Sequence, residues 1–160
     1  MSKNDTPERV VPTTDDLMAP IRLNLTLSGM DISIVRITHL RKEKSAWVIA
    51  DHAHVNWEFH YVISGEADVS TMDRTIHVGT NDLYITPPYS SHRQVTYEDP
   101  LEEYCVECNL SAPEHLAWEF AGTQIENFLR SSDVVAFSTY PSTPMLRSLF
   151  FELNRHLNTD

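Results

Sequence analysis

The sequence has 160 residues, which is about the length of one domain and enough to bury a hydrophobic core. Its formal net charge is −11 and its 12 basic residues are scattered. We therefore do not expect the chain to bind nucleic acid by itself, because a phosphate-binding surface needs clustered Lys and Arg. No apolar run approaches the roughly 18 to 20 residues of a membrane-spanning helix, and the first residues lack the apolar stretch of a secretory signal. We expect a cytoplasmic protein whose partner is a small molecule.

The first 110 residues divide into an arm and a β-rich region. Residues 1–20 are polar, contain three prolines and show no periodicity, which predicts a flexible N-terminal arm. From residue 21 to residue 110, short segments with the pattern of strands are separated by turn residues, which is typical of an all-β sandwich or barrel. The predicted strands are residues 32–37, 46–50, 57–63, 67–71, 75–78, 83–86, 92–96 and 103–110. The sequence therefore predicts a mainly β fold over residues 21–110.

Residues 111–160 have a helical period instead. Pro113 predicts the first turn of one helix, and a second helix is expected after Pro144. The apolar residues of the second helix recur at steps of three and four: Met145, Leu146, Leu149, Phe150, Leu153 and Leu157. Such a stripe either packs on the sheet of its own domain or forms part of a dimer interface, and the sequence leaves both possibilities open.

The predicted strand 57–63 has two unlike faces, because alternate side chains of a strand point to opposite sides. One face carries Glu58, His60 and Val62. The other face carries four large apolar side chains: Trp57, Phe59, Tyr61 and Ile63. Leaving these in water would forgo about 1.5 to 3 kcal/mol each. We therefore expect the C-terminal helices or a partner subunit to cover the apolar face.

Four residues have metal-binding side chains at a distinctive spacing: His52, His54, Glu58 and His92. Two imidazoles two positions apart on an extended chain point to the same side, and a carboxylate four residues later can return beside them after a short turn. Three imidazoles and one carboxylate suit zinc, iron, manganese or nickel about equally. The pattern predicts a divalent transition metal site and does not select the element.

Two further polar residues are expected to line the same interior. His60 shares a strand face with Glu58, and Gln94 shares one with His92. We expect both to bind a small ligand, and in an enzyme His60 would be the general acid or base. The alternative is that His60 is a hydrogen-bonded histidine of the interior with no role in binding.

The only cysteines are Cys105 and Cys108, which form a Cys-x2-Cys pair. Such a pair supplies half of a zinc site or a redox dithiol, but no second pair is present. Residues three apart on a strand also point to opposite faces. We predict that both cysteines are packing residues, and their small number fits a reducing compartment.

Two motifs in this sequence resemble those of the cupins. The run His-x-His-x3-Glu-x6-Gly over residues 52–65 resembles the first cupin motif, and residues 82–92 resemble the second. Cupins are small antiparallel β-barrels of the jelly-roll type. The resemblance implies that four residues correspond to the metal ligands of that family: His52, His54, Glu58 and His92.

Three residues depart from the cupin pattern. Asn81 and Tyr89 stand where cupins usually carry glycine, and Thr96 replaces the asparagine that often ends the second motif. These departures concern the turns around the predicted site, while the ligand set itself is complete.

A narrower resemblance covers about residues 30–158. Residues 57–65, 73–79 and 82–88, together with the helical tail, are similar to the ligand-binding and dimerisation domain of AraC-type transcription regulators. In that family a cupin barrel is followed by helices that pair two subunits, and the chain normally continues into two helix-turn-helix units. We expect this sequence to be the sensor half of such a regulator, the alternative being a stand-alone cupin.

The resemblance leads to two functional hypotheses. In the first, the interior binds an effector such as a sugar or another metabolite, the chain forms a homodimer, and nucleic acid is contacted only through a C-terminal domain outside this sequence. In the second, the metal is catalytic, as in small cupin isomerases and dioxygenases. A storage or structural role is the remaining alternative. We favour the sensor.

Overall fold

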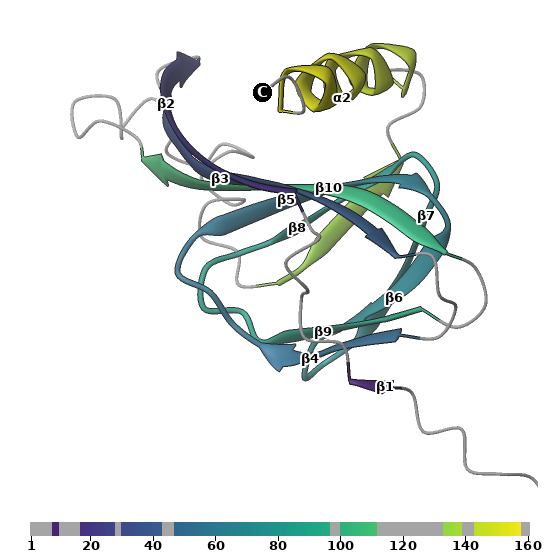
Figure 1. The fold of residues 1–160 in the computed structure, drawn as a ribbon. Coiled ribbons are helices and arrows are strands. Elements are labelled where there is room, and N and C mark those ends of the chain that lie inside the picture. Colours follow the sequence, from purple (N-terminus) through teal and green to yellow (C-terminus); the bar gives the residue numbers. More distant parts are fainter. Residues whose placement is uncertain are drawn as a thin grey trace, which may run out of the picture.

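Two β-sheets lie face to face and form the body of the protein (Figure 1). The computed structural model describes residues 8–9, 17–27, 30–42, 47–96, 100–111, 133–138 and 143–157. Among these, strands predominate and one helix is present. The mainly β fold expected from the sequence is confirmed.

The order of the strands within each sheet determines where the predicted metal ligands lie. The first sheet has the order β1-β4-β9-β6-β7. Its strands are β1 (Glu8–Arg9), β4 (Trp47–His52), β9 (His92–Thr96), β6 (Glu66–Ser70) and β7 (Thr75–Gly79). The second sheet has the order β11-β8-β5-β10-β3-β2. Its strands are β11 (Val135–Ser138), β8 (Asp82–Thr86), β5 (Trp57–Ser64), β10 (Leu101–Ser111), β3 (Met30–Lys42) and β2 (Leu17–Leu27).

The eight predicted strands correspond to β3 to β10, with ends that differ by a few residues. The difference lies at the N-terminus, where β2 begins at Leu17 and β1 covers Glu8 and Arg9, both inside the segment expected to be a flexible arm. The pairing of β2 with β3 shifts register between Pro20 and Leu23. Proline has no N–H to donate to a ladder, so it disrupts the pattern by which a strand is recognised in a sequence.

The C-terminal region also contains a strand, within the residues expected to be helical. Strand β11 pairs with β8, from Val135 opposite Ile85 to Ser138 opposite Asp82. The first predicted helix, at Pro113, lies outside the described residues, whereas the second is confirmed as α2 (Thr143–Leu157). In the part of the chain that the structure describes, no helix is both long and apolar enough to cross a membrane.

The hydrophobic core fills only part of the space between the sheets. The inner face of β5 changes along the strand from Glu58 to His60 to Val62, and Val62 is fully buried. The buried apolar residues around it form one cluster: Leu40, Trp47, Val62, Ala67, Val69, Val78, Tyr84, Leu101 and Val134. The polar residues Glu58 and His60 therefore begin where this apolar core ends.

Helix α2 lies over the outer face of the second sheet, next to β10 (Figure 1). Phe150 stacks on both Tyr61 of β5 and Tyr104 of β10, with ring centroids 4.9 Å apart in each pair. Arg147 Nη2 also donates a hydrogen bond to the carbonyl oxygen of Ile63 over 2.9 Å. The helix thus covers part of the aromatic face of β5, as expected, since stacked rings bury apolar area that water would otherwise meet.

The two positions that depart from the glycines of the cupin pattern have left-handed backbone. Asn81 has φ 73° and Tyr89 has φ 63°. Such values are uncommon for residues other than glycine, and Asn tolerates them better than most. Hydrogen bonds hold both turns: Asn81 N–H donates to Val62 O and Tyr89 N–H donates to His54 O, each over 2.8 Å. Both turns therefore have the backbone geometry that is usual for glycine, although Asn81 and Tyr89 stand in its place.

Gly65, between β5 and β6, has φ 86°, and a Cβ atom there would overlap the carbonyl oxygen of Pro100. We predict that Gly65→Ala lowers the free energy of unfolding by about 2 kcal/mol or more, because the left-handed backbone alone costs a residue with a side chain about 1 to 2 kcal/mol. Urea unfolding followed by circular dichroism measures the change. Gly79→Ala is the matched control, since the nearest atom to its Cβ would be Asp82 Oδ2 at 4.0 Å. Equal effects at the two positions would contradict the prediction.

The two cysteines of β10 face opposite sides of the sheet. Cys105 lies opposite His60 on the inner face, and Cys108 lies opposite Trp57 on the outer face. Both are buried and both are free thiols. Burial raises the pKa of Cys108 to about 12. Burial also raises the pKa of Cys105, although the neighbouring His60 acts in the opposite direction.

We therefore predict that neither cysteine of the folded, metal-free protein reacts readily with a thiol reagent at about pH 8, because the thiolate is the nucleophile and burial disfavours it. The same reagent should label both thiols once the protein is unfolded in urea. The rate of labelling in the two states is the measurement. Rapid labelling of the folded protein, or a Cys105–Cys108 disulfide under mild oxidation, would show that the two side chains share an accessible face.

Candidate functional site

The four predicted metal ligands come from three strands and one loop. His52 ends β4 and His92 begins β9, and the two residues are paired across these strands. Glu58 lies on β5, opposite Thr86 of β8. His54 lies in the loop between β4 and β5, and its carbonyl oxygen accepts a hydrogen bond from the N–H of Tyr89. The two sheets thus deliver the four side chains to one place.

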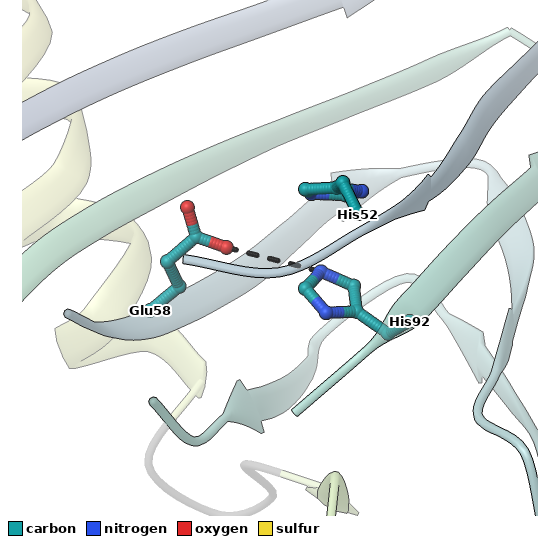
Figure 2. A group of neighbouring side chains, drawn as sticks. All are labelled: His52, Glu58 and His92. Atoms are coloured by element: carbon teal, nitrogen blue, oxygen red, sulfur yellow. Dashed lines mark ion pairs between the residues drawn. The ribbon is translucent and has the colours of Figure 1, made fainter. Parts of the chain in front are cut away.

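The distances between these side chains are short. His54 Nε2 lies 2.7 Å from Glu58 Oε2, and His92 Nε2 lies 4.0 Å from the same oxygen. One ligand atom from each of His52, Glu58 and His92 falls within 4.8 Å of the others, as Figure 2 shows for these three residues. The ring centroids of His52 and His92 are 4.3 Å apart. The structure therefore brings His52, Glu58 and His92 within reach of one ion, and His54 adjoins this group through its contact with Glu58.

Each of the three imidazoles is oriented by the main-chain carbonyl oxygen of a residue two positions away. The Nδ1 atoms of His52, His54 and His92 donate to the carbonyl oxygens of Ala50, Asn56 and Ser90, over 2.9, 2.6 and 3.0 Å. A carbonyl oxygen only accepts, so the proton must be on Nδ1 and the lone pair of a neutral ring must be on Nε2. Metal-binding histidines are characteristically held by a hydrogen bond of this kind.

The charges of the site match those of metal ligands. Burial alone would raise the pKa of Glu58, but the hydrogen bonds and charges of His54 and His60 outweigh it and hold that pKa well below its usual range. Burial lowers the pKa of His92 to about 4, against the effect of its hydrogen bond to Ser90. Near neutral pH the site thus contains a carboxylate and an uncharged imidazole, which are the forms that bind a metal.

The contact between His54 and Glu58 requires a positive charge. Two lone-pair acceptors, Nε2 of a neutral imidazole and Oε2 of a carboxylate, repel each other at 2.7 Å. A second proton on His54 or a nearby metal ion removes that repulsion. Thr86 Oγ1 lies 3.2 Å from His54 Nε2 and 3.3 Å from Glu58 Oε2, so this hydroxyl supplies only one further donor. The residues fit a divalent cation.

The two predicted ligand-binding residues belong to a buried network behind the histidines. His60 Nε2 lies 3.2 Å from Glu58 Oε2, and its ring stacks on Tyr84 with centroids 4.2 Å apart. Gln94 Nε2 donates to Tyr84 Oη over 2.9 Å and to Glu103 Oε2 over 3.1 Å. The Tyr84 hydroxyl also donates to Glu103, over 3.1 Å. His60 and Gln94 are therefore parts of one polar wall.

Electrostatics within this wall follow from burial and from its carboxylates. Burial alone would lower the pKa of His60, but Cys105, Glu103 and Glu58 raise it well above the usual value. Burial and the charge of Glu103 also raise the pKa of Tyr84, so its hydroxyl remains a proton donor. The network presents an imidazole beside Glu58 and keeps its tyrosine protonated.

Several functional candidates were missed from the sequence. Glu103 and Glu107 are buried on the inner face of β10, and Glu107 forms an ion pair with Arg36 of β3. Asn56 Nδ2 also donates to Glu107 Oε2, over 3.4 Å. The signal in the sequence was the alternation of Glu, Cys and Glu at positions 103, 105 and 107 of a predicted strand, which places all three on one face. By contrast, the ion pair of Arg36 with Glu107 depends on the pairing of β3 with β10 and could not be predicted from the sequence.

The chemistry of the site is that of a cation-binding centre with a polar wall beside it. Zinc, iron, manganese and nickel all accept imidazole and carboxylate ligands. Glu58 and His92 are 7% and 3% exposed, whereas His52 is exposed, so the site lies between the interior and solvent. His52 is thus on the solvent side of the four predicted ligands, and His60 and Gln94 are on the buried side.

Comparison with solved structures finds similarity to an oxalate decarboxylase and to KdgF. The chain is 19% identical to an oxalate decarboxylase of Bacillus subtilis with Mn(II) centres, covering 81% of this chain and 43% of that one, with a TM-score of 0.43. It is 20% identical to KdgF from Halomonas sp., covering 49% of this chain and 78% of that one, with a TM-score of 0.40. The chain thus spans less than half the length of the oxalate decarboxylase. No curated protein matches the sequence.

The family model described as the AraC-like ligand binding domain matches residues 35–159, which include all four predicted metal ligands and α2. The match covers most of the chain and agrees with the narrower of the two resemblances. The chain belongs to the family of AraC-like ligand-binding domains.

Proposed function

We propose that this chain is the small-molecule sensor domain of an AraC-type transcription regulator, with a divalent transition metal held by His52, His54, Glu58 and His92. The observation that carries the proposal is the convergence of three backbone-oriented imidazoles on a buried carboxylate, beside a buried polar wall. The family to which the chain belongs supports the sensor role. The charge of −11 makes it unsuitable for contacting DNA, which we assign to a further domain.

The effector would bind at the ion, next to the wall that contains His60 and Gln94. A bound ion supplies a positive centre to which an oxygen of the effector can coordinate. Gln94 and Tyr84 then offer hydrogen bonds at fixed positions, because each is already held by Glu103. A sugar or another oxygen-rich metabolite has the chemistry that this arrangement recognises.

Helix α2 is in a position to report occupancy of this interior. Phe150 stacks on Tyr61 and Tyr104, and each tyrosine is next in sequence to an inward residue of the site, His60 or Cys105. A ligand changes the packing of α2 only if it binds one arrangement more tightly than another. The exposed Met145 and Leu149 of α2 support the proposal that this helix also forms a homodimer interface.

A metal-dependent isomerase or dioxygenase is the second candidate function. One observation favours it: His60 Nε2 is 3.2 Å from Glu58 Oε2, so an ionisable imidazole lies within reach of a molecule bound at the ion. The stacked ring of Tyr84 and the thiol of Cys105 hold the imidazole of His60 in place.

The first test concerns the metal. We predict that His92→Ala lowers the metal content of the purified protein by about one ion per chain, because it removes an imidazole that lies 4.0 Å from Glu58. The double variant His52→Ala/His92→Ala should abolish binding at this site. Elemental analysis of protein never exposed to a chelator measures the content. His77→Ala is the control, since the side chain of His77 is 62% exposed and lies on β7. Unchanged content in the double variant would exclude the proposed site.

The second test separates the sensor from the enzyme. We predict that a sugar or small acid from a metabolite panel raises the thermal stability of the metal-loaded protein without being converted. Ligand at about 100 times its Kd stabilises the folded state by about 2.7 kcal/mol. Binding should also change the hydrogen exchange of α2 amides, and Phe150→Ala should remove that change while retaining affinity. Met145→Ala, at a position 60% exposed, is the matched control. Turnover of the bound molecule would instead support the enzyme.

A further inference from the structure

A second group of metal-binding side chains lies directly behind the first and shares one residue with it. Glu58, His60 and Cys105 each offer a ligand atom, and these atoms lie within 4.8 Å of one another. The three residues are 7%, 8% and 9% exposed. His60 and Cys105 are opposite each other on β5 and β10, so the pairing of the two strands fixes their separation. Neither belongs to the set of four ligands described above.

The distances in this second group are those of a tetrahedral metal site. Glu58 Oε2 lies 3.2 Å from His60 Nε2, and Cys105 Sγ lies 3.7 Å from the same nitrogen. Metal bonds of about 2.0 Å to nitrogen and oxygen and about 2.3 Å to sulfur place tetrahedral ligands about 3.3 Å apart for oxygen and nitrogen, and about 3.5 Å apart for nitrogen and sulfur. The two observed distances differ from these values by about 0.1 to 0.2 Å, and the third pair, Glu58 and Cys105, lies within 4.8 Å.

The far side of His60 faces a carboxylate, where each imidazole of the first site faces a main-chain carbonyl oxygen. Its Nδ1 lies 3.5 Å from Glu103 Oε1 and, within the described part of the chain, has no hydrogen-bond partner at shorter range. Glu103 is itself held by the hydroxyl of Tyr84 and the amide of Gln94. A carboxylate behind the second nitrogen of an imidazole is the usual support of a metal-bound histidine. The buried network thus has the form of an outer shell around His60.

Hydrogen bonding accounts for only part of this cluster: a charged His60 donates from Nε2 to Glu58, but the sulfur of Cys105 keeps only a long contact to the same nitrogen. His60 Nε2 carries at most one proton, yet it faces both the carboxylate of Glu58 and the sulfur of Cys105. The 3.7 Å contact to sulfur is a weak interaction for either direction of donation. A metal ion satisfies all three groups at once, because it accepts a lone pair from each.

We propose that Glu58, His60 and Cys105 form a second metal site, with Glu58 bridging two ions in one centre. Two-metal centres have ions about 3.5 to 4 Å apart, a distance that the two oxygens of one carboxylate can span. The thiol proton of Cys105 and the Nε2 proton of His60 are released to solvent as the metal–sulfur and metal–nitrogen bonds form. A thiolate with an imidazole and a carboxylate selects zinc, cobalt or iron over magnesium and calcium. This site rests on the proposed first site only through the shared Glu58.

Cobalt(II) provides the direct test, because coordination by a thiolate gives an intense charge-transfer absorption in the near ultraviolet that nitrogen and oxygen ligands do not. Chelator-stripped full chain titrated with Co²⁺ should bind about two ions and develop this band. Cys105→Ser should lose the band and bind about one ion. Cys108→Ser is the matched control, since Cys108 lies on the opposite face of β10 and should retain both the band and the stoichiometry.

His92→Ala distinguishes this proposal from the proposed function. It should lose the outer ion and keep the thiolate band, whereas loss of both with retention of the fold would overturn the independent inner site. Wild-type protein saturated at about one ion without the band would overturn it as well, and leave the outer site intact. X-ray absorption of the zinc-loaded wild type needs no variant: a sulfur neighbour at about 2.3 Å is expected, and its absence would refute the site.

Discussion

The buried carboxylate of Glu58 is the constraint on which the rest of the structure depends. It is only 7% exposed, and an ionised carboxylate in such surroundings costs several kcal/mol unless charged or hydrogen-bonding groups surround it. Its partners come from separate parts of the chain: His54 from a loop, His60 from the same strand and Thr86 from β8. His92 arrives from the facing sheet with its Nε2 4.0 Å from the carboxylate, so a cation held by both residues requires the two sheets in the observed arrangement.

The periodicity of side chains along single strands explains which parts of the site could be predicted from the sequence. The alternation on β5 predicted the inward face of Glu58 and His60, and the spacing of the histidines predicted which side chains meet. What the sequence did not reveal depends on pairing between distant strands. Tyr84 becomes part of the site because β8 lies beside β5, and Arg36 because β3 lies beside β10. β2 was partly hidden by Pro20, and β11 by its position between segments of helical period.

The turns show a different limit of sequence patterns. Asn81 and Tyr89 depart from the glycines of the cupin motifs, yet both have the left-handed backbone for which glycine is usually selected. The strain of about 1 to 2 kcal/mol per residue is offset locally. The hydrogen bond from Tyr89 N–H to His54 O ties the turn before β9 to the loop that carries a predicted ligand. The same turn therefore helps to orient His54 and leads into His92, so a change of residue has preserved the geometry that the site needs.

The inner and outer faces of β5 and β10 cannot change independently, because neighbouring residues share one backbone. His60 lies opposite Cys105, and the next pair, Tyr61 opposite Tyr104, points outward. A slip of register by one residue would exchange the faces and is excluded by burial, so only small changes of strand separation and twist remain. The ring of Phe150 stacks on both tyrosines at 4.9 Å and is sensitive to their spacing. A displacement of His60 or Cys105 would therefore be passed on to the two tyrosines on which Phe150 of α2 stacks.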